Sequence, residues 1–316
     1  MKITIDSFEE LPVELSEQMK IEFEKLIITD LGIGLELNPL EEIIIPKDFG
    51  DSVTFFQKKH GLPVGYTNNE MGMAAGKTIS YIENGELKIV IFIQNGLFFY
   101  LFDEDRKKSQ LAINLIHHEL CHVHDEFNKS KMKKINDEIE EELNKNALLR
   151  ILYAHSGIIW DEYIAPRLSA RTYLINEESD FFTEYLLDLI SDSEKKIIEE
   201  IKQYRSHDDI NELFNRVQEL TNPVMKIGAT VFGLIHGLSL QNTEIMTVIN
   251  EHIDKTFLSY VWDDLGHTLS YMFDQYPNWE SSRIFDELNN IVMKVWNELG
   301  IYPELYKEDQ LYIDVR

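Results

Sequence analysis

The chain has 316 residues, 44% of them apolar, which is enough to bury one large core or two modest ones. Acidic residues outnumber basic ones by 56 to 30, and a formal charge of -26 repels nucleic acid phosphates and anionic lipid headgroups. The single cysteine, Cys121, excludes a disulfide within the chain and fits a reducing compartment.

The N-terminal segment MKITIDSFEELP lacks a basic region followed by an apolar run, and no stretch of 18 or more apolar residues occurs. We therefore expect neither a secretory signal nor a membrane span. The sequence predicts a cytoplasmic protein that binds neither nucleic acid nor membranes.

The first third of the chain mixes helix and strand patterns. Apolar residues recur at helical spacing in residues 14–33, where Gly32 is a stop signal. Residues 40–49, LEEIIIPKDF, predict a short strand ended by proline, and residues 50–61 a short helix. In residues 76–93, GKTISYIENGELKIVIFI, apolar and polar side chains alternate on both sides of an Asn-Gly pair, which predicts a β-hairpin.

From about Asp103 to Leu299 the pattern is almost entirely helical, and the apolar residues 224–240 predict a core helix. The fold class is therefore α+β, with a small sheet first and a mostly helical C-terminal half. We expect helix breaks near Gly157, Ser206, Asn222-Pro223, Gly266 and Pro277.

The segment AINLIHHELCHVHDEF contains the pattern H-E-x-x-H at His118, Glu119 and His122. On a helix, imidazoles four positions apart project from one face and can bind one zinc ion, about 2.0 to 2.1 Å from each nitrogen. Glu119 lies beside that face, where a carboxylate reaches a water on the metal and serves as general base. The apolar residues behind the motif recur at helical spacing: Ile113, Ile116, Leu120, Val123 and Phe127.

A catalytic zinc ion needs a third protein ligand and one open position. A histidine six residues after His122 would complete one known pattern, but Asn128 occupies that position. His124 is turned about 200° from His122 around a helix, and His117 is also off the face. We expect both to face solvent or to support the site from behind.

The next candidate ligand is Glu162 in SGIIWDEYIAPRLSART, a second helical segment. Ala165 lies about one turn later and is small enough for close helix approach. Asp161 cannot share the face of Glu162 on a helix, and Glu162 has the longer reach. The sequence therefore predicts His118, His122 and Glu162 as zinc ligands.

HELCH followed by a glutamate in WDEYIAPRLSA resembles the gluzincin metallopeptidases, the thermolysin-like branch of the zincins. The spacing of Glu162 and Ala165 is also similar to that of the bacterial ImmA/IrrE-like metallopeptidases. The chain departs from the thermolysin-like pattern at Pro166, which replaces a carboxylate and should kink the ligand helix or mark its first turn.

The resemblance covers about residues 40 to 175 and implies a bacterial or mobile-element origin. The change from a mixed pattern to a helical one predicts two regions. Residues 1–177 would form a zincin-like metallopeptidase region, with a small sheet and an active-site helix. Residues 178–316 would form a helical region of unknown role.

The resemblance further implies a zinc-dependent peptidase acting on a peptide or protein substrate. Glu119 would take a proton from a metal-activated water and later pass it to the leaving amine. Residues 87–93, LKIVIFI, would form an edge strand to which an extended substrate adds. Two other functions stay open: a non-catalytic binding or interaction protein stabilised by zinc, and a helical interaction protein without metal.

The residues supporting such a site are less well specified by sequence. A zinc-bound histidine usually donates its second N–H to a carboxylate, for which Asp125 and Asp161 are candidates. A buried and inert thiol is expected at Cys121, which the helix turns away from the histidines. Four side chains are chemically able to stabilise an oxyanion: Tyr81, Tyr163, His236 and His267.

Overall fold

The computed structural model describes residues 1–6, 12–65, 68–69, 72–73, 75–174, 181–207, 209–240, 243–307 and 310–316. By packing, the chain divides into two compact units: Met1–Lys131 with Leu168–Leu174, and Met132–Arg167 with Ile175–Arg316. The expected domain boundary at residue 177 lies outside the described residues. Residues 132–167, expected in the metallopeptidase region, pack with the C-terminal unit.

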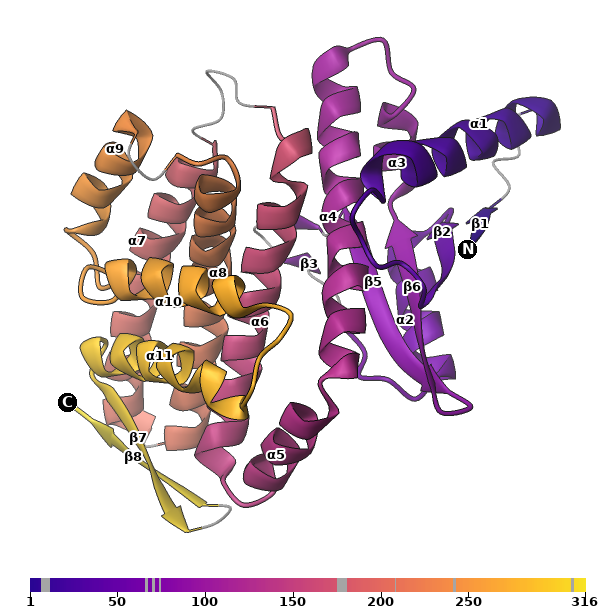
Figure 1. The fold of residues 1–316 in the computed structure, drawn as a ribbon. Helices are drawn as coiled ribbons and strands as arrows, with labels where there is room; N and C mark the ends of the chain where they lie inside the picture. The colour runs from indigo at the N-terminus through magenta and orange to yellow at the C-terminus, as the bar shows by residue number, and fades with distance from the viewer. Residues whose placement is uncertain are drawn as a thin grey trace. The chain divides into compact units, whose positions relative to one another are not determined.

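The first unit contains a sheet with the strand order β1-β2-β6-β5 (Figure 1). Strands β1, β2 and β6 run parallel, while β5 and β6 form the expected antiparallel hairpin. Asn84 and Gly85 take positive φ values of 54° and 82° at its turn, which explains the Asn-Gly pair. The strands of this unit are β1 (Lys2–Ile5), β2 (Leu40–Ile45), β3 (Asn68–Asn69), β4 (Gly72–Met73), β5 (Gly76–Glu83) and β6 (Glu86–Ile93).

Helices cover both faces of this sheet. On one face, Ile89, Ile91 and Ile93 of β6 form a core with the helices before and after the hairpin. On the other face, Val90 and Phe92 pack with the helix that follows β2. The helices on the first face are α1 (Val13–Leu26), the π-helical turn Ile27–Leu31, α3 (Asn95–Tyr100) and α4 (Arg106–Lys131). The helix on the second face is α2 (Phe49–Lys59).

The expectation that residues 87–93 form an edge strand is wrong. They belong to β6, which lies between β2 and β5 and pairs with both. Its near-continuous apolar run is typical of a strand covered on both faces. Among the described residues, β5 ends the sheet on the side of the hairpin.

The second unit is mainly helical, and Trp160 belongs to its buried core. Its indole is fully buried and packs against the rings of Tyr163, Tyr276 and Trp279. The expected core helix at residues 224–240 is confirmed by the burial of most apolar side chains of α8 up to Ile235. The helices are α5 (Lys133–Leu143), α6 (Ala147–Ser169), α7 (Phe181–His207), α8 (Ile210–Gly237), α9 (Glu244–Ile253), α10 (Trp262–Gln275) and α11 (Asp286–Glu298), with 3-10 turns at Ala170–Thr172 and Ser282–Phe285.

Some predicted helix breaks are correct and others are wrong. Helix α7 ends at His207, close to the predicted break at Ser206, and α10 ends just before Pro277. Helices α6, α8 and α10 instead continue through Gly157, Pro223 and Gly266. Packing outweighs local propensity here, since a Cβ at Gly266 would lie 2.5 Å from the Phe232 ring. Pro166 lies in the last turn of α6 and not in its first.

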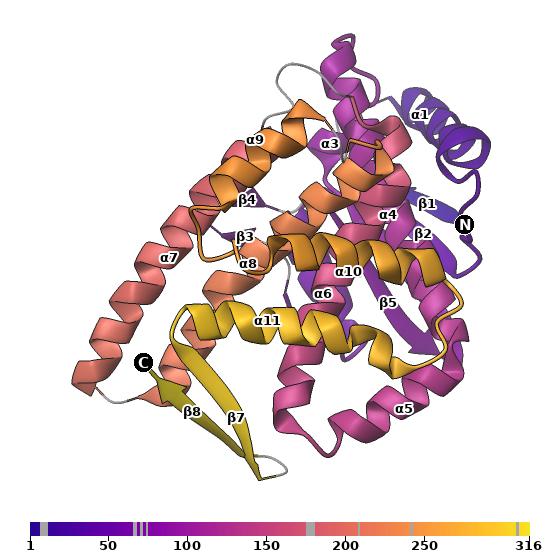
Figure 2. The ribbon, with the colours of Figure 1, turned by 60° about the vertical axis from the view of Figure 1, so that its left-hand side comes forward.

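A C-terminal hairpin follows α11 (Figure 2). Its strands β7 (Ile301–Lys307) and β8 (Gln310–Val315) are antiparallel, and β7 contacts α11. In the described part of the chain, every helix is too short or too polar to cross a membrane. The molecule is thus of mixed α+β class, with its larger sheet confined to the first unit.

Candidate metal centre

Helix α4 rests on the sheet through a stripe of apolar side chains. Ala112, Ile116, Leu120 and Val123 are spaced four, four and three residues apart and are fully or almost fully buried in the core that contains the β6 isoleucines. The Asp105 carboxylate accepts a hydrogen bond from the backbone N–H of Lys107 and caps the start of the helix. This packing directs an adjacent polar face of α4 toward β5.

His118 and His122 lie one turn apart on α4 and are both half-buried. Their Nε2 atoms are 3.0 Å apart, and the ring planes meet at 85°. In a tetrahedral zinc site the two nitrogens would be about 3.3 Å apart, given bonds of about 2.0 to 2.1 Å. The histidine pair can therefore hold one ion after only a small rotation of the rings.

The half-buried carboxylate of Glu119 is held against the sheet edge. Thr78 of β5 donates its hydroxyl to Glu119 Oε2 over 2.6 Å, and the backbone carbonyl of Glu119 lies 3.3 Å from the same hydroxyl. A Cβ added at Gly76 would come within 2.7 Å of Glu119 Oε1. The missing side chain of Gly76 thus provides the space that Glu119 occupies.

Two further carboxylates lie on α4 beyond His122. Asp125, a predicted support, is almost fully buried and pairs with Lys129 at 3.0 Å. Glu126 pairs with Lys129 at 2.8 Å and accepts a hydrogen bond from Ser80 of β5 at 3.3 Å. Burial raises the pKa of Glu126, but Lys129, His122 and Ser80 outweigh it and leave that pKa below its usual value.

The flanking histidines do not face the pair. His117 is buried, lies 3.0 Å from Thr172 Oγ1, and has its pKa lowered to about 4, mainly by burial. His124 is half-buried and accepts the backbone N–H of Glu36 at 2.8 Å. Of the two expected environments, solvent does not apply to the buried His117, and both histidines are turned toward protein partners.

Cys121 is fully buried, as expected from its position on the helix. Burial raises the pKa of its thiol far above the usual range, so the reactive thiolate does not form near neutral pH. The prediction of an inert thiol at this position stands on these two observations.

Glu162 lies on α6 in the second unit and is half-buried. Its neighbours Trp160 and Ala165 are fully buried, which fixes the rotation of α6 about its axis. Lys226 of α8 pairs with Glu162 Oε1 at 2.8 Å. The ammonium group of Lys226 thus holds one oxygen of the Glu162 carboxylate.

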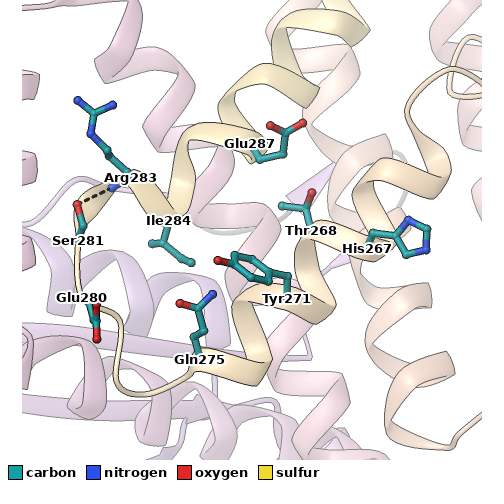
Figure 3. Close-up of a pocket in the computed structure, with 9 residues that line it drawn as sticks. All are labelled: His267, Thr268, Tyr271, Gln275, Glu280, Ser281, Arg283, Ile284 and Glu287. Atoms are coloured by element: carbon teal, nitrogen blue, oxygen red, sulfur yellow. Dashed lines mark hydrogen bonds between the residues drawn. The ribbon is translucent and has the colours of Figure 1, made fainter.

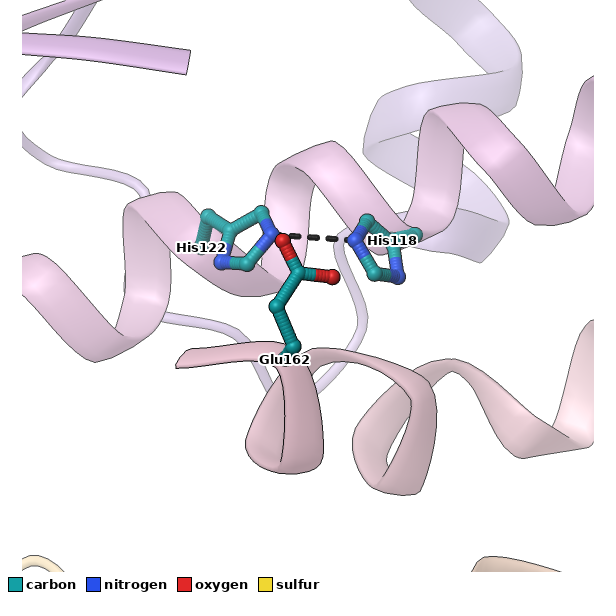
Figure 4. A group of neighbouring side chains, drawn as sticks. All are labelled: His118, His122 and Glu162. Atoms are coloured by element: carbon teal, nitrogen blue, oxygen red, sulfur yellow. Dashed lines mark hydrogen bonds between the residues drawn. The ribbon is translucent and has the colours of Figure 1, made fainter. Parts of the chain in front are cut away.

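Figure 4 draws the three predicted ligands, with His118 and His122 on α4 of the first unit and Glu162 on α6 of the second. Two imidazoles and one carboxylate are the donor set of many catalytic zinc sites. Such a group could bind a metal ion, although the donor types alone do not determine which one. One helix fixes the histidine pair, whereas the participation of Glu162 belongs to the proposal below.

Of the oxyanion stabilisers considered, Tyr81 is engaged elsewhere. It is buried on the face of β5 that packs with α2, and its hydroxyl donates to the Glu41 carboxylate. Burial and the hydrogen bond to Glu41 raise its pKa to about 12. Tyr81 therefore faces away from the side of β5 that contacts Glu119.

Tyr163 and His236 bind each other within the second unit. The Tyr163 hydroxyl lies 2.9 Å from His236 Nδ1 and accepts from Arg167, so its proton is directed to the histidine. Burial lowers the pKa of His236 to about 4 and keeps the ring neutral. The fourth side chain, His267, is exposed on α10.

His267 lines a hollow of about 470 Å³ in the second unit, between α10 and the start of α11 (Figure 3). The walls include the exposed ring of Tyr271 and the carboxylates of Glu280 and Glu287. None of the predicted zinc ligands lines this hollow. His267 thus belongs to a different surface feature.

The sequence interpretation missed Thr78, Glu126 and Lys226. Glu126 lies four residues after His122, and this helical spacing was a usable signal. The small or hydroxyl side chains of Gly76, Thr78 and Ser80 alternate along β5, which places them on one face. Nothing in the sequence indicated that Lys226 would reach Glu162.

No protein-family model matches the chain, and comparisons with curated proteins and with solved structures also find no match. The resemblance to gluzincins therefore remains a prediction from the HELCH motif and Glu162.

Proposed function

We propose that the chain is a zinc-dependent peptidase in which His118, His122 and Glu162 bind the metal and Glu119 is the general base. The observation that carries the proposal is the juxtaposed Nε2 pair, 3.0 Å apart on one helix, with a fixed carboxylate beside it. A structural role for the histidines alone would not require Glu119 to be oriented as well.

A zinc ion bound by these residues would polarise the scissile carbonyl and make water more acidic. Glu119 accepts the proton of the attacking water and later donates it to the leaving amine nitrogen. His118 and His122, held by the helix, need no large rearrangement to serve as ligands. The two steps together hydrolyse an amide without a covalent intermediate.

The sheet edge supports a peptide substrate. Strand β5 ends the sheet within the described part of the chain, and its Thr78 contacts Glu119. An extended peptide that pairs with the β5 backbone would pass beside this carboxylate. The proposed edge is β5 and not β6, which lies in the sheet interior.

The test compares wild-type protein with Glu119→Gln, using Glu104→Gln on the exposed surface as control. We expect all three proteins to bind one zinc ion. The wild type and the control should cleave members of a peptide library, detected by mass spectrometry, while Glu119→Gln should lose about 10²-fold or more of the rate. Equal cleavage by Glu119→Gln, or a wild type that takes up no zinc, would contradict the proposal.

If zinc binds but the wild type cleaves nothing in a broad library, the zinc-stabilised binding protein becomes the better description. Zinc should then raise the melting temperature of the wild type and of Glu119→Gln by the same amount, because the glutamate is not a ligand.

A further inference from the structure

We infer that β5 positions the Glu119 carboxylate through two features, the hydroxyl of Thr78 and the missing side chain of Gly76. The inference rests on the proposed function, since it assigns the residues that orient its general base. Both are positioning residues: they contact Glu119, and the contacts involve β5 and α4 of the first unit only.

The face of β5 toward α4 differs from that of its neighbour. Strand β6 presents isoleucines to α4, whereas the corresponding face of β5 carries Gly76, Thr78 and Ser80. Thr78 and Ser80 donate hydrogen bonds to Glu119 and Glu126, which lie on the adjacent face of α4. The hydroxyl side chains at the sheet edge thus lie where α4 presents its carboxylates, and the apolar side chains lie where α4 is apolar.

Thr78 fixes one of the two carboxylate oxygens. Its hydroxyl lies 2.6 Å from Glu119 Oε2, a short contact typical of a hydroxyl that donates to a charged oxygen. A glutamate side chain has several rotatable bonds, and the hydrogen bond from Thr78 removes much of that conformational freedom. A general base must hold its reactive oxygen within a fraction of an ångström, so such a constraint directly affects the rate.

Gly76 provides the space. A Cβ at this position would lie 2.7 Å from Glu119 Cγ and Oε1 and 2.8 Å from Cδ, closer than real contacts allow. The neighbour that must move is the far end of a flexible side chain, and the φ of Gly76 is not positive. Gly76→Ala should therefore fold and displace the Glu119 carboxylate.

The chain offers a matched control for the hydroxyl. Thr4 of β1 donates to the Glu42 carboxylate, which is the same kind of hydrogen bond in the same sheet. Strand β1 lies at the opposite end of the strand order from β5. Thr4→Val therefore removes a similar contact without touching Glu119.

The experiment measures zinc content, KM and kcat for Thr78→Val, Thr78→Ser, Thr4→Val and Gly76→Ala, on a peptide that the wild type cleaves. We expect one zinc ion in each variant and a KM within about twofold of wild type. For Thr78→Val and Gly76→Ala, kcat should fall by about 10- to 100-fold. Thr78→Ser should restore kcat to within about threefold, and Thr4→Val should leave it unchanged.

A wild-type kcat in Thr78→Val, or an equal loss in Thr78→Val and Thr78→Ser, would overturn the inference. The failure of the proposed function is a separate result, decided by Glu119→Gln and zinc uptake. In that case a cycle of Thr78→Val and Glu119→Leu in zinc-free protein still tests the contact. If the double variant loses as much melting temperature as the two single variants together, the inference is overturned. A loss smaller than that sum would support the contact.

Discussion

The two units of the molecule contribute to the proposed site in different ways. In the first unit, the spacing of one helix places the two histidine nitrogens 3.0 Å apart, and Thr78 at the sheet edge holds the Glu119 carboxylate. In the second unit, Glu162 forms an ion pair with Lys226 and lies on a helix anchored by buried aromatic rings. In the proposed function the first unit provides two ligands and the general base, and the second unit would add one carboxylate that a metal ion shares with the Lys226 ammonium group.

The largest expected effect concerns the histidine pair. Replacing His122 with alanine removes one of the two neutral nitrogen ligands, and we expect stoichiometric zinc binding to be lost in metal analysis after dialysis. His252→Ala is the matched control, because His252 is exposed on α9. Retention of one tightly bound zinc ion by His122→Ala would place the site elsewhere.

Replacing Glu162 of the second unit should weaken zinc binding less than replacing His122. Glu162→Ala should weaken zinc binding by about 10² to 10³-fold in a competition titration with a chelator, since two imidazoles still bind the ion. Glu298→Ala, on the exposed side of α11, should have no effect. An unchanged affinity in Glu162→Ala would remove the second unit from the site.

Replacing Glu126 should lower the zinc affinity less than replacing Glu162. The charge of Glu126 favours a more basic His122, so Glu126→Ala should reduce zinc affinity by about tenfold. Glu126→Gln keeps the side-chain volume and serves as comparison. If both variants bind zinc with wild-type affinity, Glu126 does not influence the metal site, and its role is limited to its contacts with Lys129 and Ser80.

Lys226 should act in the opposite direction. Its ammonium pairs with Glu162 at 2.8 Å and opposes a divalent cation at the same carboxylate. Because the side chain of Lys226 is 34% exposed, we expect only about a threefold to tenfold gain in zinc affinity for Lys226→Met. Lys226→Arg keeps the charge and should show no such gain, and a loss of affinity in Lys226→Met would show that the pair supports the site.

The smallest effect is a pH dependence in the second unit. Burial lowers the pKa of His236 from 6.5 to about 4, so between these values the unfolded chain binds more protons than the folded one. The contribution of the neutral, buried His236 to the unfolding free energy is present above pH 6.5 and is lost as the pH falls toward 4. With a chelator present, His236→Gln should show a weaker decline of the unfolding free energy over this range than the wild type.

Local sequence signals predicted much of the first unit correctly. The Asn84-Gly85 turn, the strand before Pro46 and the helix after it follow from backbone preferences that involve few residues. The second unit was predicted less well, because long-range packing decides whether a helix continues. Gly266 against Phe232 is an example, since glycine there permits close approach and does not end a helix.

The same distinction applies to the site. The histidine pair and Glu119 follow from the spacing of one motif on one helix, and the sequence also singled out Glu162. The contacts that hold these residues are non-local: Thr78 precedes Glu119 by 41 positions, and Lys226 follows Glu162 by 64 along the chain. Sequence patterns reveal neither contact, because both depend on how separate elements pack.

The most direct test is an anomalous diffraction map at the zinc absorption edge, measured on crystals of zinc-loaded protein. We expect one strong peak about 2.0 to 2.2 Å from Nε2 of His118, Nε2 of His122 and a carboxylate oxygen of Glu162. A peak bound by other residues, or a peak bound by the histidines with Glu162 still paired to Lys226, would contradict this expectation.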